Sequence, residues 1–280
     1  MLTILLSSVT SLLFGCSDFL GGLASRRDSA FAVTANAHLI GLAIMAVAVV
    51  VFPSPFGVAD LAWGAAAGVA GGIGVTALYG ALAVGRMGVV APLTAALSGS
   101  LPALYDLLRG TALRPLSLVG LAIALVAIVI VSASGDPEER AEMPSRAIAL
   151  AVLAGVGFTG CFIFFSLAAK TSGLMPLLAA RVVSVALLLM AITFARRGHV
   201  TLAPDARASA YGAGALDAAA NVTMLTAIRI GPLAVASVLG SLYPVVTILL
   251  ARVVLKERLR PVQRAGVVLA LAAVMLTAIR

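Results

Sequence analysis

Two similar stretches of this sequence decide how the chain folds: RPLSLVGLAIALVAIVIV (Arg114–Val131) and RPVQRAGVVLALAAVML (Arg260–Leu276). In both, an Arg-Pro pair precedes a glycine that lies five residues after the proline, and an Ala/Leu/Val-rich segment follows. Upstream, SGSLPAL (Ser98–Leu104) matches GSLYPVV (Gly240–Val246). The spacing between each pair of matches is about half the chain, which predicts that the second half repeats the first.

The composition indicates that the solvent of this chain is a lipid bilayer. Hydrophobic residues make up 62% and charged residues 11% of the 280 residues, and the mean hydropathy is +1.15. Soluble domains carry roughly 25% charged residues, so this chain could not cover a water-exposed surface. Because hydrocarbon offers the backbone no hydrogen-bond partner, spanning segments must be helices or closed barrels. The apolar runs here are continuous, which favours helices over the alternating pattern of a barrel.

A spanning helix needs about 20 apolar residues, and the sequence contains about ten such segments. They cover residues 2–24, 30–52, 60–84, 88–108, 116–133, 146–169, 174–194, 208–229, 232–251 and 262–279. We therefore predict an all-α integral membrane protein with two five-helix repeats, residues 1–133 and 146–280, joined by a connector at 134–145. Because five is odd, the second repeat would enter the membrane from the opposite side, as an inverted repeat.

An inverted repeat favours a transporter, because the two copies can expose one midplane site first to one face and then to the other. The alternative is a duplicated membrane protein that does not transport. The net charge of +8 fits membrane-facing helix ends, and no aromatic-interleaved basic patch indicates nucleic-acid binding. Most of the basic residues follow the odd-numbered segments, which by the positive-inside rule places both termini outside.

The segment GSLYPVVTILLARVVLKERLRPVQRAGVVLALAAV (Gly240–Val274) and the two five-helix halves resemble the EamA family of the drug/metabolite transporter superfamily. The most telling features are Pro244, the run Glu257-Arg258-Leu259, and Gly266 after it. The resemblance implies an exporter of metabolites or amino acids, or a drug efflux protein, usually secondary-active. Many members of the family are thought to have both termini inside, in contrast to the charge distribution here.

Ionisable side chains inside a membrane cost about 2.5–3.5 kcal/mol each on insertion scales, so they are candidates for a functional site. Here they are Asp18, His38, Arg181 and Asp217. Asp18 either pairs with a basic neighbour at the interface, or binds a cation, an amino group or a proton in a cavity. The resemblance implies the second role, because small multidrug-resistance relatives use a carboxylate in their first helix for it. Only the helix corresponds, since the residues around Asp18 do not match the motif of those relatives.

Asp217 and Asn221 lie four residues apart, on one helical face. They either line a polar cavity, or Asp217 pairs with Arg181 to hold two helices together, and the two readings are compatible. Asn36 corresponds to Arg181 in the other half and lies close to His38 along the chain. His38 either packs as a hydrogen-bonded residue or carries a proton. We expect all these residues, with Asp18, to contribute to one substrate-binding cavity.

Two further patterns concern helix packing and bending. Small residues recur every four positions along one segment: Gly64, Gly68, Gly72, Thr76 and Gly80. This stripe predicts close approach of a neighbouring helix. Pro102 and Pro244 fall inside predicted helices, where proline bends the backbone and frees a carbonyl. They are either static kinks or hinges.

We predict a secondary-active transporter, an exporter, that moves a small metabolite, amino acid or drug by alternating access across the cell (plasma) membrane. The expected partners are a small-molecule substrate and the lipid bilayer. Coupling to a proton would require Asp18 or Asp217 to titrate near neutral pH, and a homodimer remains open. We expect no enzyme activity, cofactor or metal, because no metal-spaced ligand cluster or phosphate-binding motif occurs. The alternatives are a non-transporting binding or regulatory subunit, an enzyme acting on lipid, and a channel.

Overall fold

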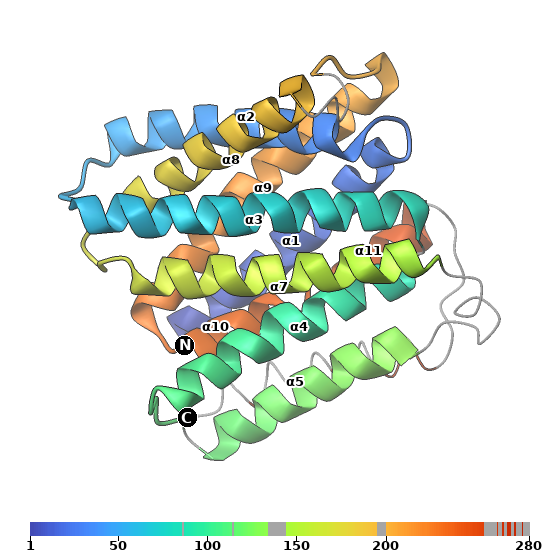
Figure 1. Cartoon of the computed structure of the whole chain (residues 1–280). Helices are drawn as coiled ribbons and strands as arrows, with labels where there is room; N and C mark the ends of the chain where they lie inside the picture. Colours follow the sequence, from blue (N-terminus) through green and yellow to red (C-terminus); the bar gives the residue numbers. More distant parts are fainter. Residues whose placement is uncertain are drawn as a thin grey trace.

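The computed structural model describes residues 1–85, 87–113, 115–133, 144–194 and 200–254, together with the isolated residues 262, 265, 268, 269, 272 and 276. Within these ranges the chain forms α-helices joined by connectors (Figure 1). The first half contains α1 (Leu2–Ser25), α2 (Ala30–Val51), α3 (Val58–Val84), α4 (Met87–Leu108) and α5 (Pro115–Ala133). The second half contains α7 (Ser145–Leu167), α8 (Met175–Phe194), α9 (Pro204–Ile230), α10 (Leu233–Gly240) and α11 (Tyr243–Val254).

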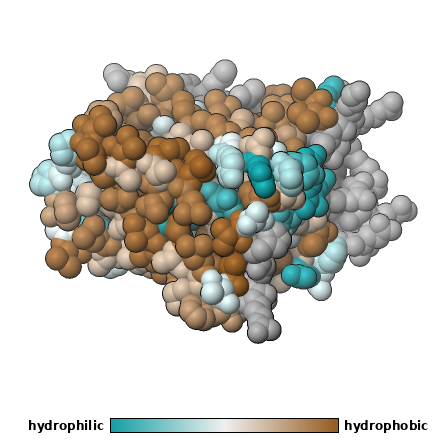
Figure 2. Space-filling model, turned by 90° about the horizontal axis from the view of Figure 1, so that it is seen from above, coloured by the Kyte–Doolittle hydropathy of each residue, from teal (hydrophilic) through white to brown (hydrophobic). Residues whose placement is uncertain are grey.

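The helical membrane architecture is confirmed in its coarse form. Six described segments are long and apolar enough to cross a bilayer: α1, α2, α3, α7, α8 and the region Leu233–Val254. The hydrophobic side chains that such helices expose cover much of the face shown in Figure 2, where hydrophilic residues gather mainly toward one end. The last predicted segment, 262–279, lies outside the described residues apart from its six isolated positions, and so does most of the 134–145 connector.

The segment predicted as one helix over 232–251 is two helices in the structure. α10 ends at Gly240, and α11 begins at Tyr243, so Pro244 is the second residue of a new helix rather than an interior kink. Proline has no N–H and its ring clashes with the carbonyl four residues earlier, which interrupts a continuous helix here but is tolerated in a first turn. Pro102, by contrast, lies inside the unbroken α4.

The two halves interlock, and several contacts between them occur twice with the halves exchanged. α3 packs along α7, as α1 packs along α9, and α3 contacts α8, as α2 contacts α9 (Figure 1). Likewise α4 packs on α7, and the α10–α11 pair packs on α1. This exchange is the pattern that a pseudo-two-fold axis between the predicted repeats would produce.

The small-residue stripe of α3 meets α8 along part of its length. A Cβ added to Gly64 would lie 2.8 Å from the Cα of Pro176, and one added to Gly68 would lie 2.7 Å from the Cα of Ala180. Both distances are shorter than real Cβ contacts, so only glycine allows the two backbones to come this close. This contact positions Arg181, the next residue of α8, against the centre of the bundle.

Carboxylates of the first half bind backbone N–H groups of the second half at both ends of the bundle. At one end, Asp60 accepts a hydrogen bond from the N–H of Ala169 at 2.6 Å, and Asp106 accepts one from Ala234 at 2.8 Å. At the other end, Asp28 accepts a hydrogen bond from the N–H of Ala203 at 2.8 Å. We call these three contacts the end latches.

Candidate functional site

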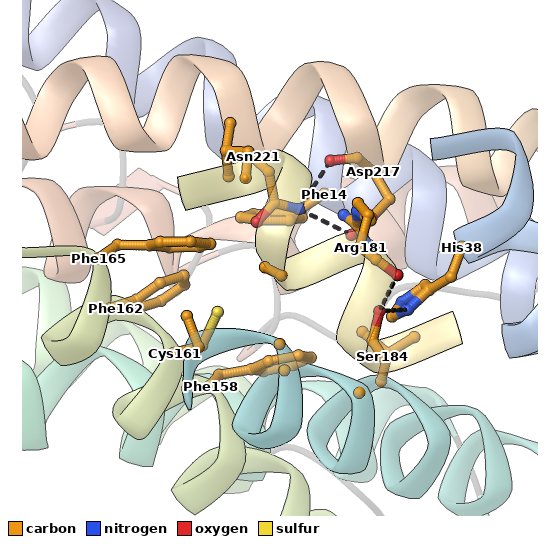
Figure 3. A pocket seen from close by; sticks show the side chains of 17 residues that line it. Phe14, His38, Phe158, Cys161, Phe162, Phe165, Arg181, Ser184, Asp217 and Asn221 are labelled. Carbon is orange, nitrogen blue, oxygen red and sulfur yellow. Dashed lines mark hydrogen bonds and ion pairs between the residues drawn. The ribbon is translucent and has the colours of Figure 1, made fainter. Parts of the chain in front are cut away.

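A pocket lies at the centre of the bundle, and both halves line it (Figure 3). The first half contributes Phe14 of α1, His38 of α2 and the glycine face of α3. The second half contributes α7, α8 and α9. Their side chains that face the pocket are Phe158, Cys161, Phe162, Phe165, Arg181, Ser184, Asp217 and Asn221.

An ion pair forms the polar centre of the pocket. Arg181 of α8 donates through Nη2 to Oδ2 of Asp217 on α9, and both side chains are 8% exposed. Asn221, one turn further along α9, donates through Nδ2 to Oδ1 of Asp217 at 3.1 Å. Each charge has its counter-ion, which is the arrangement that makes charged groups tolerable inside a membrane. Arg181 and Asp217 therefore form the predicted ion pair and also line the cavity.

His38 extends the polar centre toward α8. Its Nδ1 lies 2.9 Å from Oγ of Ser184, and Ser184 in turn donates to the backbone oxygen of Arg181 at 3.2 Å. Nε2 of His38 is buried and has no hydrogen-bond partner among the described residues. A buried polar atom without a partner is costly, so Nε2 could take a partner only if the His38 side chain or its neighbours move.

Aromatic rings form the opposite wall. Phe158, Phe162 and Phe165 project from α7, and the rings of Phe14 and Phe162 are 6.4 Å apart (Figure 3). The cavity between this wall and the ion pair measures about 40 Å³. Since one water needs about 10–15 Å³, the pocket has room for a few waters. A larger molecule would require the surrounding side chains or helices to move.

Two of the predicted site residues lie outside this pocket. Asn36 donates through Nδ2 to the backbone oxygen of Val200 at 2.7 Å, which ties α2 to the connector before α9. Asp18 is 7% exposed and lies close enough to Asp217, Tyr79 and Tyr243 to interact with them electrostatically, but it does not line the pocket. No ion pair involves Asp18 in the part of the chain that the structure describes.

The sequence analysis missed Ser184 and the phenylalanine wall of α7. Ser184 lies 146 residues after His38, one residue from the position that the Asn36–Arg181 match would pair with His38. Ser98 and Ser241, 143 residues apart, meet at 3.1 Å between their Oγ atoms. Both spacings are close to that of the repeat, which was the signal that could have found these pairs. The phenylalanines carry no such signal, because apolar residues occur on every face of these helices.

The pocket offers no metal site among the described residues, since no three His, Cys, Asp or Glu side chains lie together. What it offers is one cationic and one anionic group side by side, an amide, an imidazole nitrogen and aromatic rings. This arrangement can bind a molecule that carries both charges, or exchange the ion pair for two new ones.

The six described segments that are long and apolar enough to cross a bilayer indicate a multi-pass membrane protein. Residues 145–279 match the profile of the EamA-like transporter family. Members of this family are transporters rather than enzymes. No curated protein matches the chain. A solved crystal structure with 20% sequence identity matches the fold with a TM-score of 0.69, over 96% of this chain and 94% of that chain.

Proposed function

We propose that this protein is a secondary-active transporter that moves a small zwitterionic molecule, such as an amino acid or a drug with both an amine and a carboxylate, by alternating access. The observation that carries the proposal is the Arg181–Asp217 ion pair, buried in a pocket that both halves line. A substrate carboxylate would take Arg181 and a substrate ammonium group would take Asp217. The substrate would thus replace the ion pair, and neither Arg181 nor Asp217 would lose its counter-ion inside the membrane.

The aromatic wall fits the same substrate class. Phe158, Phe162 and Phe165 would bury the apolar part of the substrate, and aromatic faces also attract an ammonium group. Asn221 and His38, which both line the pocket, would supply the hydrogen bonds that orient the molecule. Pockets that combine apolar walls with a few placed polar groups are typical of small-molecule sites.

Alternating access is supported by the exchanged packing of the two halves and by the end latches. Each latch is a hydrogen bond between a carboxylate and a backbone N–H that crosses between the halves. Releasing the latches at one end while those at the other end hold would open the pocket to one side only. Asp18, buried near Asp217 without an ion pair in the described chain, is the group we propose to bind a coupling proton.

Counterflow in proteoliposomes tests the proposal. Vesicles preloaded with an unlabelled candidate from a panel of amino acids, sugars, nucleosides and cationic drugs should accumulate the labelled form when the candidate is a substrate. We expect Asp217→Asn and Arg181→Gln to reduce this exchange at least tenfold. Asp205→Asn, the same change at a 65% exposed side chain, should leave it intact. Undiminished exchange by both pocket variants would refute the assignment of the site.

The alternative is a membrane-embedded binding subunit that does not transport. The small volume of the pocket favours this alternative, and a static protein would also bury its ion pair. Thermal stabilisation of the purified protein by a ligand, lost in Asp217→Asn, without counterflow of that ligand would establish this alternative.

A further inference from the structure

A second cavity lies on the outside of the bundle. It is a groove of about 710 Å³ that follows α3, with α7 on one side and α2 and α8 on the other. Its walls include Val69, Ile73, Leu153 and Leu187, which are 40%, 46%, 46% and 39% exposed. Since these helices cross the membrane, the groove opens toward lipid. Its volume is in the range of pockets that hold ligands.

The groove exists because α3 and α8 diverge. Gly64 and Gly68 are in close contact with α8, whereas a Cβ added to Gly80 would meet only Leu150 at 3.4 Å and Ala30 at 3.9 Å, ordinary contact distances. Thr76 and Gly80 continue the small-residue stripe beyond the point where α8 covers it, and both line the groove. The small residues there make the groove deep, although no helix occupies it.

One end of the groove carries a positive charge. Arg146, the second residue of α7, lines this end, near Ser29 at the start of α2. Among the described residues that line the groove, Arg146 alone is charged. Both residues lie at helix ends, where the head groups of a bilayer are found, whereas Val69 and Ile73 lie deep along α3. The groove is therefore amphipathic along its length, with a cationic entrance and an apolar interior.

We propose that this groove binds one acyl chain of an anionic membrane phospholipid, whose phosphate group lies on Arg146. From Val69 to Val84 the groove follows α3 for about 22 Å at 1.5 Å per residue. One leaflet of a bilayer core is about 15 Å thick, so the groove can hold the chain of one leaflet. A basic residue at the mouth of an interhelical groove is the chemistry that binds anionic head groups.

The bound chain would lie directly outside the central pocket. Gly72 and Ser184 line both cavities, and a Cβ on Gly72 would be 3.1 Å from the Cβ of Ser184. Lipid and substrate pocket would thus be separated by one layer of small side chains. The lipid site goes beyond the proposed transport function and does not depend on it.

Tryptophan quenching by brominated lipids tests the proposal. The chain has a single tryptophan, Trp63, which stacks on Phe164 away from the groove. In a Trp63→Phe/Leu153→Trp protein the only indole lies in the groove. We expect brominated phosphatidylglycerol to quench it about fivefold more effectively than brominated phosphatidylcholine at equal mole fraction, the preference that one basic residue supplies.

Two pairs of variants locate the lipid. Arg146→Gln should abolish the preference for phosphatidylglycerol, whereas Arg207→Gln, which changes another exposed arginine at a helix start, should keep it. Gly80→Leu should fill the groove and reduce quenching by both lipids, whereas Ala62→Leu, at an exposed position of the same helix, should not. Native mass spectrometry of each variant should show the corresponding loss or retention of bound phosphatidylglycerol.

Three results would overturn the proposal. The first is equal quenching by the two lipids, and the second is a preference that survives Arg146→Gln. Either would show ordinary lipid contact without a head-group site. The third is stronger quenching by a brominated free fatty acid than by brominated phosphatidylglycerol, which would assign the groove to a free amphiphile.

Discussion

A guanidinium and a carboxylate persist in the interior of this membrane protein because each is the counter-ion of the other. Arg181 and Asp217 are 8% exposed, and Asn221 satisfies the second carboxylate oxygen. Removing one partner of a buried pair leaves a charge that neither water nor protein compensates. Asp18 has no such ion pair among the described residues, which distinguishes it from Asp217 and makes it the better candidate for a proton.

At this scale we predict strong coupling between the two residues of the ion pair. Arg181→Met or Asp217→Leu alone should lower the free energy of unfolding by about 3–5 kcal/mol, because each leaves an uncompensated buried charge. The double variant should lose much less than the sum of the two. Equilibrium unfolding in mixed micelles, followed by circular dichroism, measures the free energy of unfolding of the unchanged protein, the two single variants and the double variant. Additive losses would show that the two side chains do not depend on each other.

The small-residue stripe of α3 forms a close contact with α8 at one end and the floor of a groove at the other. Along α3, Gly64 and Gly68 contact α8, and sixteen residues after Gly64 the stripe ends at Gly80, where α8 no longer covers it. The same spacing of small residues therefore has two outcomes, and only the path of α8 distinguishes them. The α10–α11 break is a second case, because Pro244 begins a helix instead of bending one.

At the element scale we predict opposite effects for alanine at the two ends of the stripe. Gly68→Ala should destabilise the protein by about 1–3 kcal/mol, because the new Cβ would press on the backbone of Ala180 and separate α3 from α8. Gly80→Ala is the matched control: its Cβ has ordinary contacts, and replacing glycine within a helix should stabilise by up to about 1 kcal/mol. Thermal denaturation in detergent compares the two variants. Similar melting temperatures would contradict a close contact between α3 and α8 at Gly68.

For the whole molecule, the exchanged packing and the end latches suggest two bundles that move against each other. Cys161 would report such motion, because it lines the pocket and is only 7% exposed. Asp60 holds the N–H groups of both Gly57 and Ala169, so it fastens the start of α3 to the connector after α7. Losing this charge-assisted contact should favour opening at that end.

We therefore predict that Asp60→Asn accelerates modification of Cys161. In a Cys16→Ser background, a small water-soluble thiosulfonate should label Cys161 about 5- to 30-fold faster than without Asp60→Asn, as expected for a loss of about 1–2 kcal/mol from the closed state. Lys170→Gln, an exposed change in the connector that Asp60 fastens, should leave the rate unchanged. Equal labelling rates for all variants would indicate a rigid pocket and would favour the non-transporting alternative.

The sequence by itself determined the solvent, the helices and the polar residues that matter. Its apolar runs predicted the helices from residue 2 to 230 to within a few residues, because a spanning helix needs about 20 apolar residues wherever it lies. Asp217, Arg181 and His38 stood out because an ionisable group is rare in hydrocarbon. The inverted arrangement stays a prediction that the exchanged packing supports.

Only the tertiary structure decided which of these residues meet. It brought Arg181, Asp217, Asn221 and His38 into one pocket, and it left Asn36 hydrogen-bonded to a connector and Asp18 outside the pocket wall. It also added Ser184 and the phenylalanine wall. The reason is physical: in a chain that is apolar on every side, hydropathy does not reveal which face of a helix turns inward. That choice depends on how closely the backbones can pack.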